Sequence, residues 1–333
     1  RNLEIAKKLV EEYDGSVDAI GLDGIPIHLE LGRAHRYYRP GRELQELAKQ
    51  TPVVDGSGVR AGLERWAVTL ADRNEPGILS QKRVLMCPGV NHVGLAQAIG
   101  RLSPEVHYYD PEIFFRVPDV PGVGRPETLE TADAPTLDLL RDASLERVSP
   151  PPIPRNKPAT SHIRWADVIA GDVAAIRNIA PPRLEKKTVV VPYATAEDVG
   201  DLRGRGVAIL MTLLPSISGK EDDMARHSAA VIEACFVALR KDTSAPLTED
   251  AYLDLMADIR WSPKVTYLQD TDKINRFAFV IHPLSVEFIH RAKGFELTKY
   301  LPDLVVEEAA ARLKPMYVGK ITAGPSPETG QRI

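Results

Sequence analysis

Short runs of β-forming residues alternate with stretches of helical periodicity along most of the chain, and this alternation limits the possible folds most strongly. Strands separated by helices pair in parallel, so the pattern predicts an α/β fold: a Rossmann-like, mostly parallel sheet with helices on both faces. Strands are expected at 17–22, 52–54, 82–87, 105–109, 166–170, 187–191, 207–213, 277–281 and 315–321. Helices are expected at 3–12, 59–72, 92–101, 136–142, 173–179, 196–203, 222–240, 249–257, 285–291 and 302–312.

The chain divides into four predicted parts. An α/β part at 1–110 carries a candidate nucleotide loop, and a second α/β part covers 161–270. The proline-dense segment 111–160 between them predicts a connection or flap with one short helix. Residues 276–333 are expected to form a small C-terminal α/β block. The first helix has no strand before it, which predicts that the chain is a fragment of a longer protein.

Charge and cysteine content exclude several classes of protein. The 42 Lys and Arg residues against 46 Asp and Glu give a formal net charge of -4, without a basic cluster, so a nucleic-acid binder is not expected. No apolar run reaches the ~18 residues of a membrane span. Cys87 and Cys235 are the only cysteines, which predicts no disulfide framework and a cytoplasmic location. The eight His residues form no metal-binding motif, and no metal site is predicted.

The turn after the strand at 82–87 is the strongest local signal for ligand binding. A dinucleotide-binding unit needs a glycine turn, a helix N-terminus facing the pyrophosphate and an acid about 20 residues further on for the ribose. Gly89 and Gly94 can form such a turn, and Asp110 lies 21 positions after Gly89. The glycine spacing differs from G-x-G-x-x-G, so a βαβ unit that binds nothing is the alternative. The residues predicted to contact the cofactor are Gly89, Asn91, His92, Gly94, Asp110, Thr195 and Thr212.

Three residues are candidates for the catalytic site, and each has a structural alternative. Asp55 opens a DGSG turn before a helix, which predicts either an anion cradle with Asp55 on a substrate hydroxyl, or a capped turn. Asp172 follows a strand and opens a helix, where it could hold a substrate hydroxyl or act as an N-cap. Lys157 in the proline-dense segment could be an acid/base group or an anion clamp, or a solvated loop residue.

Three stretches carry a resemblance to a known family: DAIGLDG at 18–24, TPVVDGSG at 51–58 and WADVIAGD at 165–172. With shorter matches between them, residues 17–268 resemble a bacterial family labelled quinate 5-dehydrogenase-like, within the shikimate and quinate dehydrogenases. This resemblance implies a Rossmann-like oxidoreductase that uses NAD or NADP on a small polyol or hydroxy acid. The Lys–Asp pair of well-understood shikimate and quinate dehydrogenases, with its N-V-T-x-P segment, has no counterpart here.

The C-terminal block carries a second resemblance. FAFVIHPL at 277–284 and ITAG at 321–324 are similar to the N-terminal start of long-chain acyl-ACP reductase-like proteins. This resemblance, over 276–330, implies a reductase domain fused downstream as a covalent partner.

Together these observations predict an NAD(P)-dependent oxidoreductase of a small polyol or hydroxy acid. Asp110 favours NAD, because an acid at the ribose disfavours a 2′-phosphate. Two alternatives stay open: a Rossmann-like binding or regulatory module attached to an acyl reductase, and a transferase of phosphate-bearing ligands. A homodimer is the expected assembly on general grounds.

Overall fold

The fold is known from a computed structural model, which describes residues 2–117, 124–149, 159–216, 225–240, 248, 250–252, 254 and 261–269. Residues 1–266 form one compact unit. The C-terminal block expected at 276–333, with its strands, helices and resemblance, lies outside the described residues.

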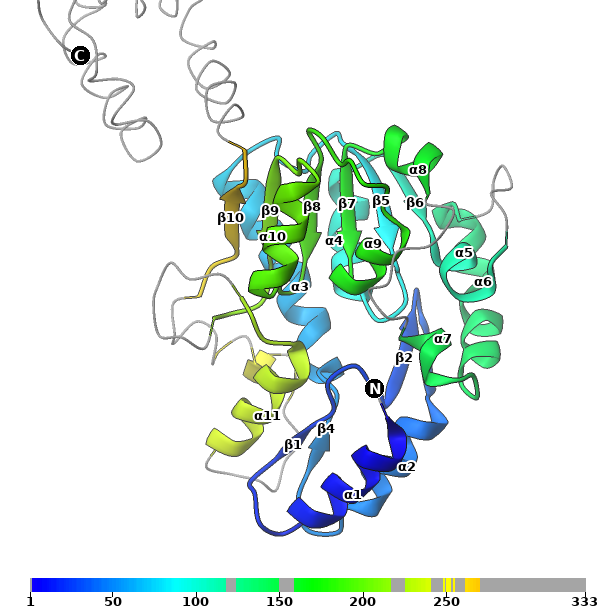
Figure 1. Cartoon of the computed structure of the whole chain (residues 1–333), viewed down its shortest axis with the longest axis vertical. Coiled ribbons are helices and arrows are strands. Elements are labelled where there is room, and N and C mark those ends of the chain that lie inside the picture. The colour runs from blue at the N-terminus through cyan, green and yellow to red at the C-terminus, as the bar shows by residue number, and fades with distance from the viewer. Residues whose placement is uncertain are drawn as a thin grey trace, which may run out of the picture. The chain divides into compact units, whose positions relative to one another are not determined.

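One six-stranded sheet organises this unit, with its strands in the order β10, β9, β8, β7, β5, β6 (Figure 1). The strands are β5 (Arg83–Cys87), β6 (Glu105–Tyr108), β7 (Val168–Gly171), β8 (Thr188–Val191), β9 (Ile209–Thr212) and β10 (Lys264–Tyr267). The pairs β6–β5, β5–β7, β7–β8 and β8–β9 are all parallel. The predicted α/β fold with a mostly parallel sheet is therefore confirmed. Strands predicted on both sides of the proline-dense segment join in this one sheet.

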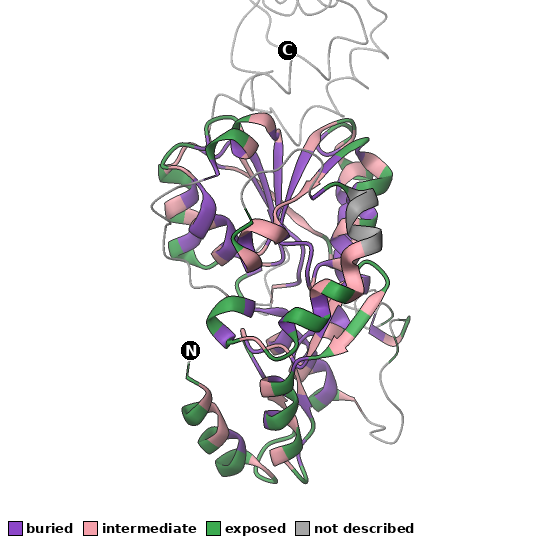
Figure 2. Ribbon diagram, turned by 90° about the vertical axis from the view of Figure 1, so that its right-hand side faces the viewer, coloured by how far each residue is buried: buried purple, intermediate pink, exposed green. Residues whose placement is uncertain are grey.

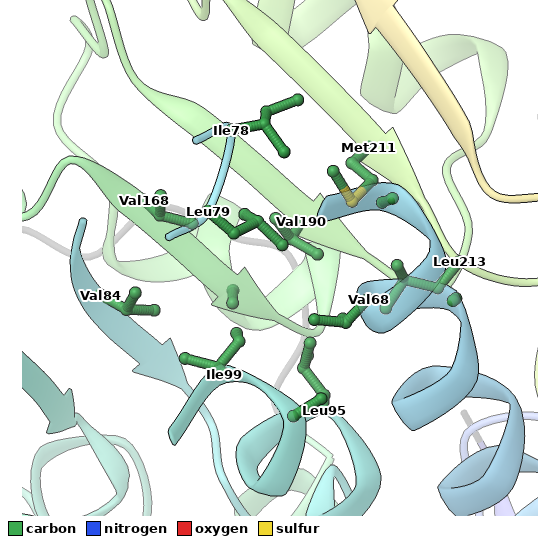
Figure 3. Close-up of a cluster of buried hydrophobic side chains, with 14 of the residues drawn as sticks. Val68, Ile78, Leu79, Val84, Leu95, Ile99, Val168, Val190, Met211 and Leu213 are labelled. Atoms are coloured by element: carbon green, nitrogen blue, oxygen red, sulfur yellow. The ribbon is translucent and has the colours of Figure 1, made fainter. Parts of the chain in front are cut away.

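Helices cover both faces of the sheet because its strands alternate apolar side chains between the two faces. Val84 of β5, Val168 of β7 and Val190 of β8 enter the same core cluster, shown in Figure 3. The helices α3 (Ser57–Asn74) and α4 (Val93–Leu102) contribute Val68 and Leu95 to this cluster, among other residues. On the other face lie α8 (Thr160–Trp165), α9 (Val173–Ile179) and α10 (Ala196–Gly204) (Figure 1). Figure 2 shows the strands buried between these helices.

The strand order determines where a ligand can bind. Numbered along the chain from β5, the strands stand in the order 2-1-3-4-5-6. This is the second common order of doubly wound sheets and not the 3-2-1-4-5-6 order of dinucleotide-binding folds. The chain reverses direction across the sheet between β5 and β7, so the carboxyl ends of these two strands form the crevice where ligands bind in such sheets.

A smaller N-terminal layer adjoins this edge of the sheet. It holds the parallel pair β1 (Ile20–Gly21) and β4 (Val53–Val54), and the antiparallel hairpin of β2 (His28–Leu31) and β3 (Ala34–Tyr37). Three helices complete it, namely α1 (Leu3–Tyr13), α2 (Arg39–Leu47) and α11 (Ala229–Leu239). The helix α11 packs against β1, β4 and α3, so the chain returns to this layer after completing β9. The hairpin and α2 were not predicted. The hairpin strands are four residues long, and only two of their eight residues, Leu29 and Leu31, are buried, so they carry little apolar signal.

The prediction of one short helix at 111–160 was wrong. The described part of this segment contains α5 (Asp110–Phe115), α6 (Pro126–Leu140) and α7 (Leu145–Val148). Pro111 and Pro126 stand in the first turn of α5 and α6, where a backbone N–H has no helical partner to lose. These two prolines are therefore compatible with the first turn of a helix, and the high proline content of the segment does not exclude helices.

The close approach of α3 and α4 gives a test of the core packing. An alanine Cβ at Gly94 would lie 1.8 Å from the carbonyl oxygen of Ala61 in α3. We expect Gly94→Ala to lower the free energy of unfolding by about 1–3 kcal/mol or more, because the two helices must separate. Chemical denaturation monitored by circular dichroism measures this loss.

Gly100 supplies the matched control, since it lies in the same helix and a Cβ added to it would meet nothing within 4 Å. Gly100→Ala is expected to raise the free energy of unfolding by about 0.5–1 kcal/mol through helix propensity. Equal effects of the two substitutions would contradict the packing described for Gly94.

Candidate functional site

A cavity of about 120 Å³, here called the switch-point pocket, lies at the carboxyl ends of β1, β4, β5, β7 and β8. It includes the turn after β5 and the first residues after β7, which flank the reversal point of the sheet. The N-terminal end of α11 forms a further wall. Drug-sized ligands occupy pockets of about 300–1,000 Å³, so this cavity suits a small metabolite and is too small to enclose a dinucleotide.

The pocket brings together four of the predicted site residues, Asp55, Asn91, His92 and Asp172. Gly89 instead lines a second hollow of about 670 Å³ beside α4 and β6. Neither hollow is lined by Gly94, Asp110, Thr195 or Thr212. Lys157 lies outside the described residues.

His92 and Glu64 form a buried pair at the pocket wall. The Nδ1 atom of His92 lies 2.8 Å from Oε1 of Glu64, and only 6% of His92 and 0% of Glu64 are exposed. An ionised carboxylate accepts hydrogen bonds only, so Glu64 favours the tautomer with the proton on Nδ1. Glu64 Oε2 also accepts from the backbone N–H of Leu95, 3.4 Å away, which ties α3 to the first turn of α4. The imidazole is thereby oriented with Nε2 as its proton acceptor.

Arg60 connects two of the turns that line the pocket. Its Nη1 donates to the carbonyl oxygen of Asn91 and its Nη2 to that of Asp55, each at 3.0 Å. The Asp55 carboxylate accepts backbone hydrogen bonds from Ile27 and His28, at 2.5 and 3.0 Å. Burial raises the pKa of Asp55, but hydrogen bonding with His28 and the charge of Arg60 outweigh it and hold the pKa well below its usual range. Asp55 is therefore a buried anion that fixes the strand ends.

The turn from Asp55 to Gly58 was predicted as a possible anion cradle, and the structure favours the capped-turn alternative. The Gly56 N–H donates to Oε2 of Glu233 at 2.7 Å, and the Ser57 N–H donates to Oδ1 of Asp55 at 3.0 Å. Gly56 has φ of 87°, a left-handed conformation that glycine adopts without strain. Burial and the nearby Asp55 charge raise the pKa of Glu233, whose Oε1 also accepts from Tyr252 at 3.0 Å. Side chains of the protein thus occupy the N-terminus of α3.

The contacts of Asp110 do not fit its predicted role on a cofactor ribose. Its carboxylate oxygens accept from the backbone N–H groups of Gly89, at 2.8 Å, and Val90, at 2.8 Å. A pyrophosphate would need these same N–H groups. Asp110 is 1% exposed, and a Cβ on Gly89 would lie 2.5 Å from the Tyr108 ring, so the turn is packed from behind. The described residues therefore do not form the predicted cradle.

The other predicted residues mostly cap helices. Asp172 Oδ1 accepts from the Ala175 N–H at 2.9 Å at the start of α9, and Thr195 forms a capping box with Asp198 at the start of α10. Asp172 still lines the pocket, and no hydrogen bond to its Oδ2 is found among the described residues. Thr212 is fully buried, and its hydroxyl has no hydrogen-bond partner in the described structure.

Sequence reasoning missed Glu64, Arg60 and Ser228, which line or support the pocket. Glu64 carries a detectable signal, because it shares the spacing i, i+4, i+7 with the apolar residues Val68 and Ala71 of the same helix. A charged residue on a buried stripe indicates a specific partner. Arg60 and Ser228 carry no such signal.

Metal-binding clusters and membrane-spanning helices are both absent from the part of the chain that the structure describes. Within it, no cluster of three or more His, Cys, Asp or Glu side chains has the arrangement of a metal site. None of the helices described there combines the length and apolar character needed to cross a membrane.

The buried carboxyl of Asp110 predicts a pH dependence of stability. Burial raises its pKa to about 6, although the N–H bonds from Gly89 and Val90 act in the opposite direction. An unfolded Asp titrates near pH ~3.9, so the folded protein binds the extra proton between the two values. The free energy of unfolding should therefore fall as pH rises from about 4 to about 6, by an amount on the order of 2–3 kcal/mol, and then level off.

Denaturant titrations of the wild type and Asp110→Asn at a series of pH values measure this contribution. The substitution should remove the fall from the pH profile, whatever its effect at any single pH. The exposed Asp18→Asn should keep the wild-type profile. Parallel profiles for wild type and Asp110→Asn would show that the Asp110 pKa is not raised.

Two protein families match this chain. Residues 58–268 match the family described as Domain of unknown function (DUF8754), and residues 1–55 match the one described as Domain of unknown function (DUF8753). The two matches meet at the turn between β4 and α3. No curated protein and no solved structure matches, so the resemblance to dehydrogenases stays a prediction. Since the first match covers more than half of the 333 residues, the chain belongs to the DUF8754 family.

Proposed function

We propose that this chain is an enzyme of small hydroxylated metabolites, polyols or hydroxy acids, in which His92 removes a proton from a substrate hydroxyl. The observation that carries the proposal is the 2.8 Å contact of His92 Nδ1 with buried Glu64 at the wall of the switch-point pocket. A carboxylate that holds one imidazole nitrogen orients the other nitrogen and stabilises the imidazolium that forms. Such a positioned base is what alcohol chemistry requires.

The polar groups of the pocket support a hydroxylated substrate. The carboxylates of Asp23 and Asp172 line it, and carboxylates accept hydrogen bonds from hydroxyl groups. Asp172 uses Oδ1 to cap α9, which holds its side chain in place for a ligand. The 120 Å³ volume equals that of about four water molecules, so it suits a substrate of few heavy atoms.

The specific reaction that we propose is oxidation of the alcohol with NAD or NADP, NAD being favoured. This part rests on the resemblance of residues 17–268 to the quinate 5-dehydrogenase-like family. The contacts of Asp110 do not support the predicted cofactor position, so the proposal assigns the described residues to substrate binding and proton transfer only.

The experiment screens hydroxy acids and polyols for reduction of NAD or NADP by the purified chain. With a substrate in hand, His92→Gln should lower kcat by about 10²- to 10⁴-fold, the usual contribution of a general base. Glu64→Gln should also lower kcat and should shift the pH profile of kcat, because the imidazolium loses its stabilising charge. His35→Gln, an exposed histidine outside the pocket, is the control and should leave kcat unchanged.

Unchanged turnover in His92→Gln would contradict the assignment of the base. Binding of hydroxylated ligands without turnover on either cofactor would favour the alternative of a binding or regulatory module. Turnover of a phosphorylated donor without a nicotinamide would favour the transferase alternative.

A further inference from the structure

We infer that the switch-point pocket binds a carboxylate, held between Arg60 and the N-terminus of α11, and that Ser228 is a ligand of this carboxylate. The inference rests on the proposed function and narrows its substrates to hydroxy acids. Three features lie on one wall of the pocket: a cation that forms no ion pair, an uncapped helix end and a buried hydroxyl without a hydrogen bond, all among the residues that the structure describes.

The first feature is the charge of Arg60. Its guanidinium donates to two backbone carbonyl oxygens, those of Asn91 and Asp55, and lines the pocket. Among the described residues, no Asp or Glu side chain lies within ion-pair distance of it. By contrast, Arg177 and Arg83 each pair with carboxylates. The two carbonyl contacts hold the Arg60 side chain in position. Its charge lowers the pKa of Asp55, but no carboxylate among the described residues forms an ion pair with the guanidinium, so a ligand anion can still bind to it.

The second feature is the N-terminus of α11, a helix of 11 residues. Its first residues, Ala229 and Ala230, line the pocket together with Ser228. No acceptor for the Ala229 and Ala230 N–H groups is present in the described part of the chain, and the helix has no side-chain cap there. The unpaired N–H groups and the helix dipole favour an anion at this end.

The third feature is the hydroxyl of Ser228. Ser228 is only 8% exposed, occupies the N-cap position of α11 and lines the pocket. Its Oγ is buried without a hydrogen-bond partner in the described structure. At α10, in contrast, Thr195 bonds its own helix. A buried hydroxyl without a partner is destabilising, and a ligand oxygen in the pocket would supply the missing acceptor.

The other charges around the pocket select a carboxylate over a phosphate. Asp23, Asp55 and Asp172 line it with Arg60 and His92. The Asp55 charge is already compensated by N–H donors from Ile27, His28 and Ser57, but it still repels an incoming anion. A carboxylate adds one negative charge to this lining, and Arg60 and the helix end are its favourable partners. A dianionic phosphate adds a second charge that no further Lys or Arg among the described lining residues offsets.

The experiment compares glycerol, glycerate and glycerol 3-phosphate, three ligands built on three carbon atoms. They share a hydroxylated skeleton and differ in the group that the Arg60 and α11 wall would bind. Amide NMR spectra of the full chain are recorded with each ligand up to millimolar concentrations. We expect glycerate to shift the amide signals of Ala229 and Ala230 and to bind at least about tenfold more tightly than glycerol, the usual gain from a charged hydrogen-bond pair. Glycerol 3-phosphate should bind more weakly than glycerate.

Variants then test the three features separately. Ser228→Ala should weaken glycerate binding by about two- to tenfold, and Arg60→Gln by about ten- to a hundredfold, with glycerol binding unchanged in both. Arg65→Gln removes the same charge from the same helix outside the pocket, and Ser144→Ala removes the N-cap serine of α7. Both controls should bind glycerate as the wild type does. If Arg60→Gln disrupts the turns at Asn91 and Asp55 because two hydrogen bonds are lost, Ser228→Ala still tests the inference.

Several outcomes would overturn the inference: no shift at Ala229 and Ala230 with glycerate, equal binding of glycerol and glycerate, or unchanged glycerate binding in Ser228→Ala and Arg60→Gln. Tighter binding of glycerol 3-phosphate would replace the carboxylate with a phosphate. His92→Gln should still bind glycerate. A protein that binds glycerate in this manner but never uses His92 in turnover would refute the proposed function and leave the carboxylate site in place.

Discussion

The turns that form the pocket are held in place by buried carboxylates that accept hydrogen bonds from backbone N–H groups. Asp110 does this for the turn after β5, Asp55 for the start of β2, Glu64 for the start of α4 and Glu233 for the start of α3. A buried N–H group without an acceptor is costly, and a buried carboxylate without donors is more so. Each of these hydrogen bonds therefore satisfies a buried N–H group and a buried carboxylate at the same time. The positions of the pocket residues depend on these four contacts.

This arrangement explains why acids near strand ends are ambiguous in a sequence. An Asp about 20 residues after a glycine turn fits a ribose ligand, and Asp110 has this spacing. Here the same geometry lets it reach back to the glycine turn of its own sheet, where it takes the place that a bound phosphate would have. The residue type and the spacing are the same in both cases. Only the direction of the carboxylate separates them.

The chemistry of the pocket follows from what these structural carboxylates leave available. His92 keeps one nitrogen for a ligand because Glu64 holds the other. The Arg60 guanidinium is available to a ligand anion because, among the described residues, it bonds to backbone carbonyls and forms no ion pair, although its charge also lowers the pKa of Asp55. The end of α11 keeps its N–H groups because Ser228 does not cap it. A base, a cation and a helix end thus meet in one small cavity between the two layers of the unit, which is the basis of both proposals.

The sequence by itself determined the fold class and most of the sheet. Buried parallel strands are continuous apolar runs, so the ends of β5, β7, β8 and β9 were each predicted to within two residues of the observed ends. The same pattern placed Asp55, Asn91, His92 and Asp172 at strand ends, where the pocket lies. The order of the strands, the return of α11 to the N-terminal layer, and the partners of Glu64, Arg60 and Ser228 were decided only by the tertiary structure. The physical reason is that sequence periodicity shows only which face of a helix or strand is buried. Hydrogen bonds between distant residues, such as His92 with Glu64 (28 positions apart) and Gly56 with Glu233 (177 positions apart), depend on how the elements pack together.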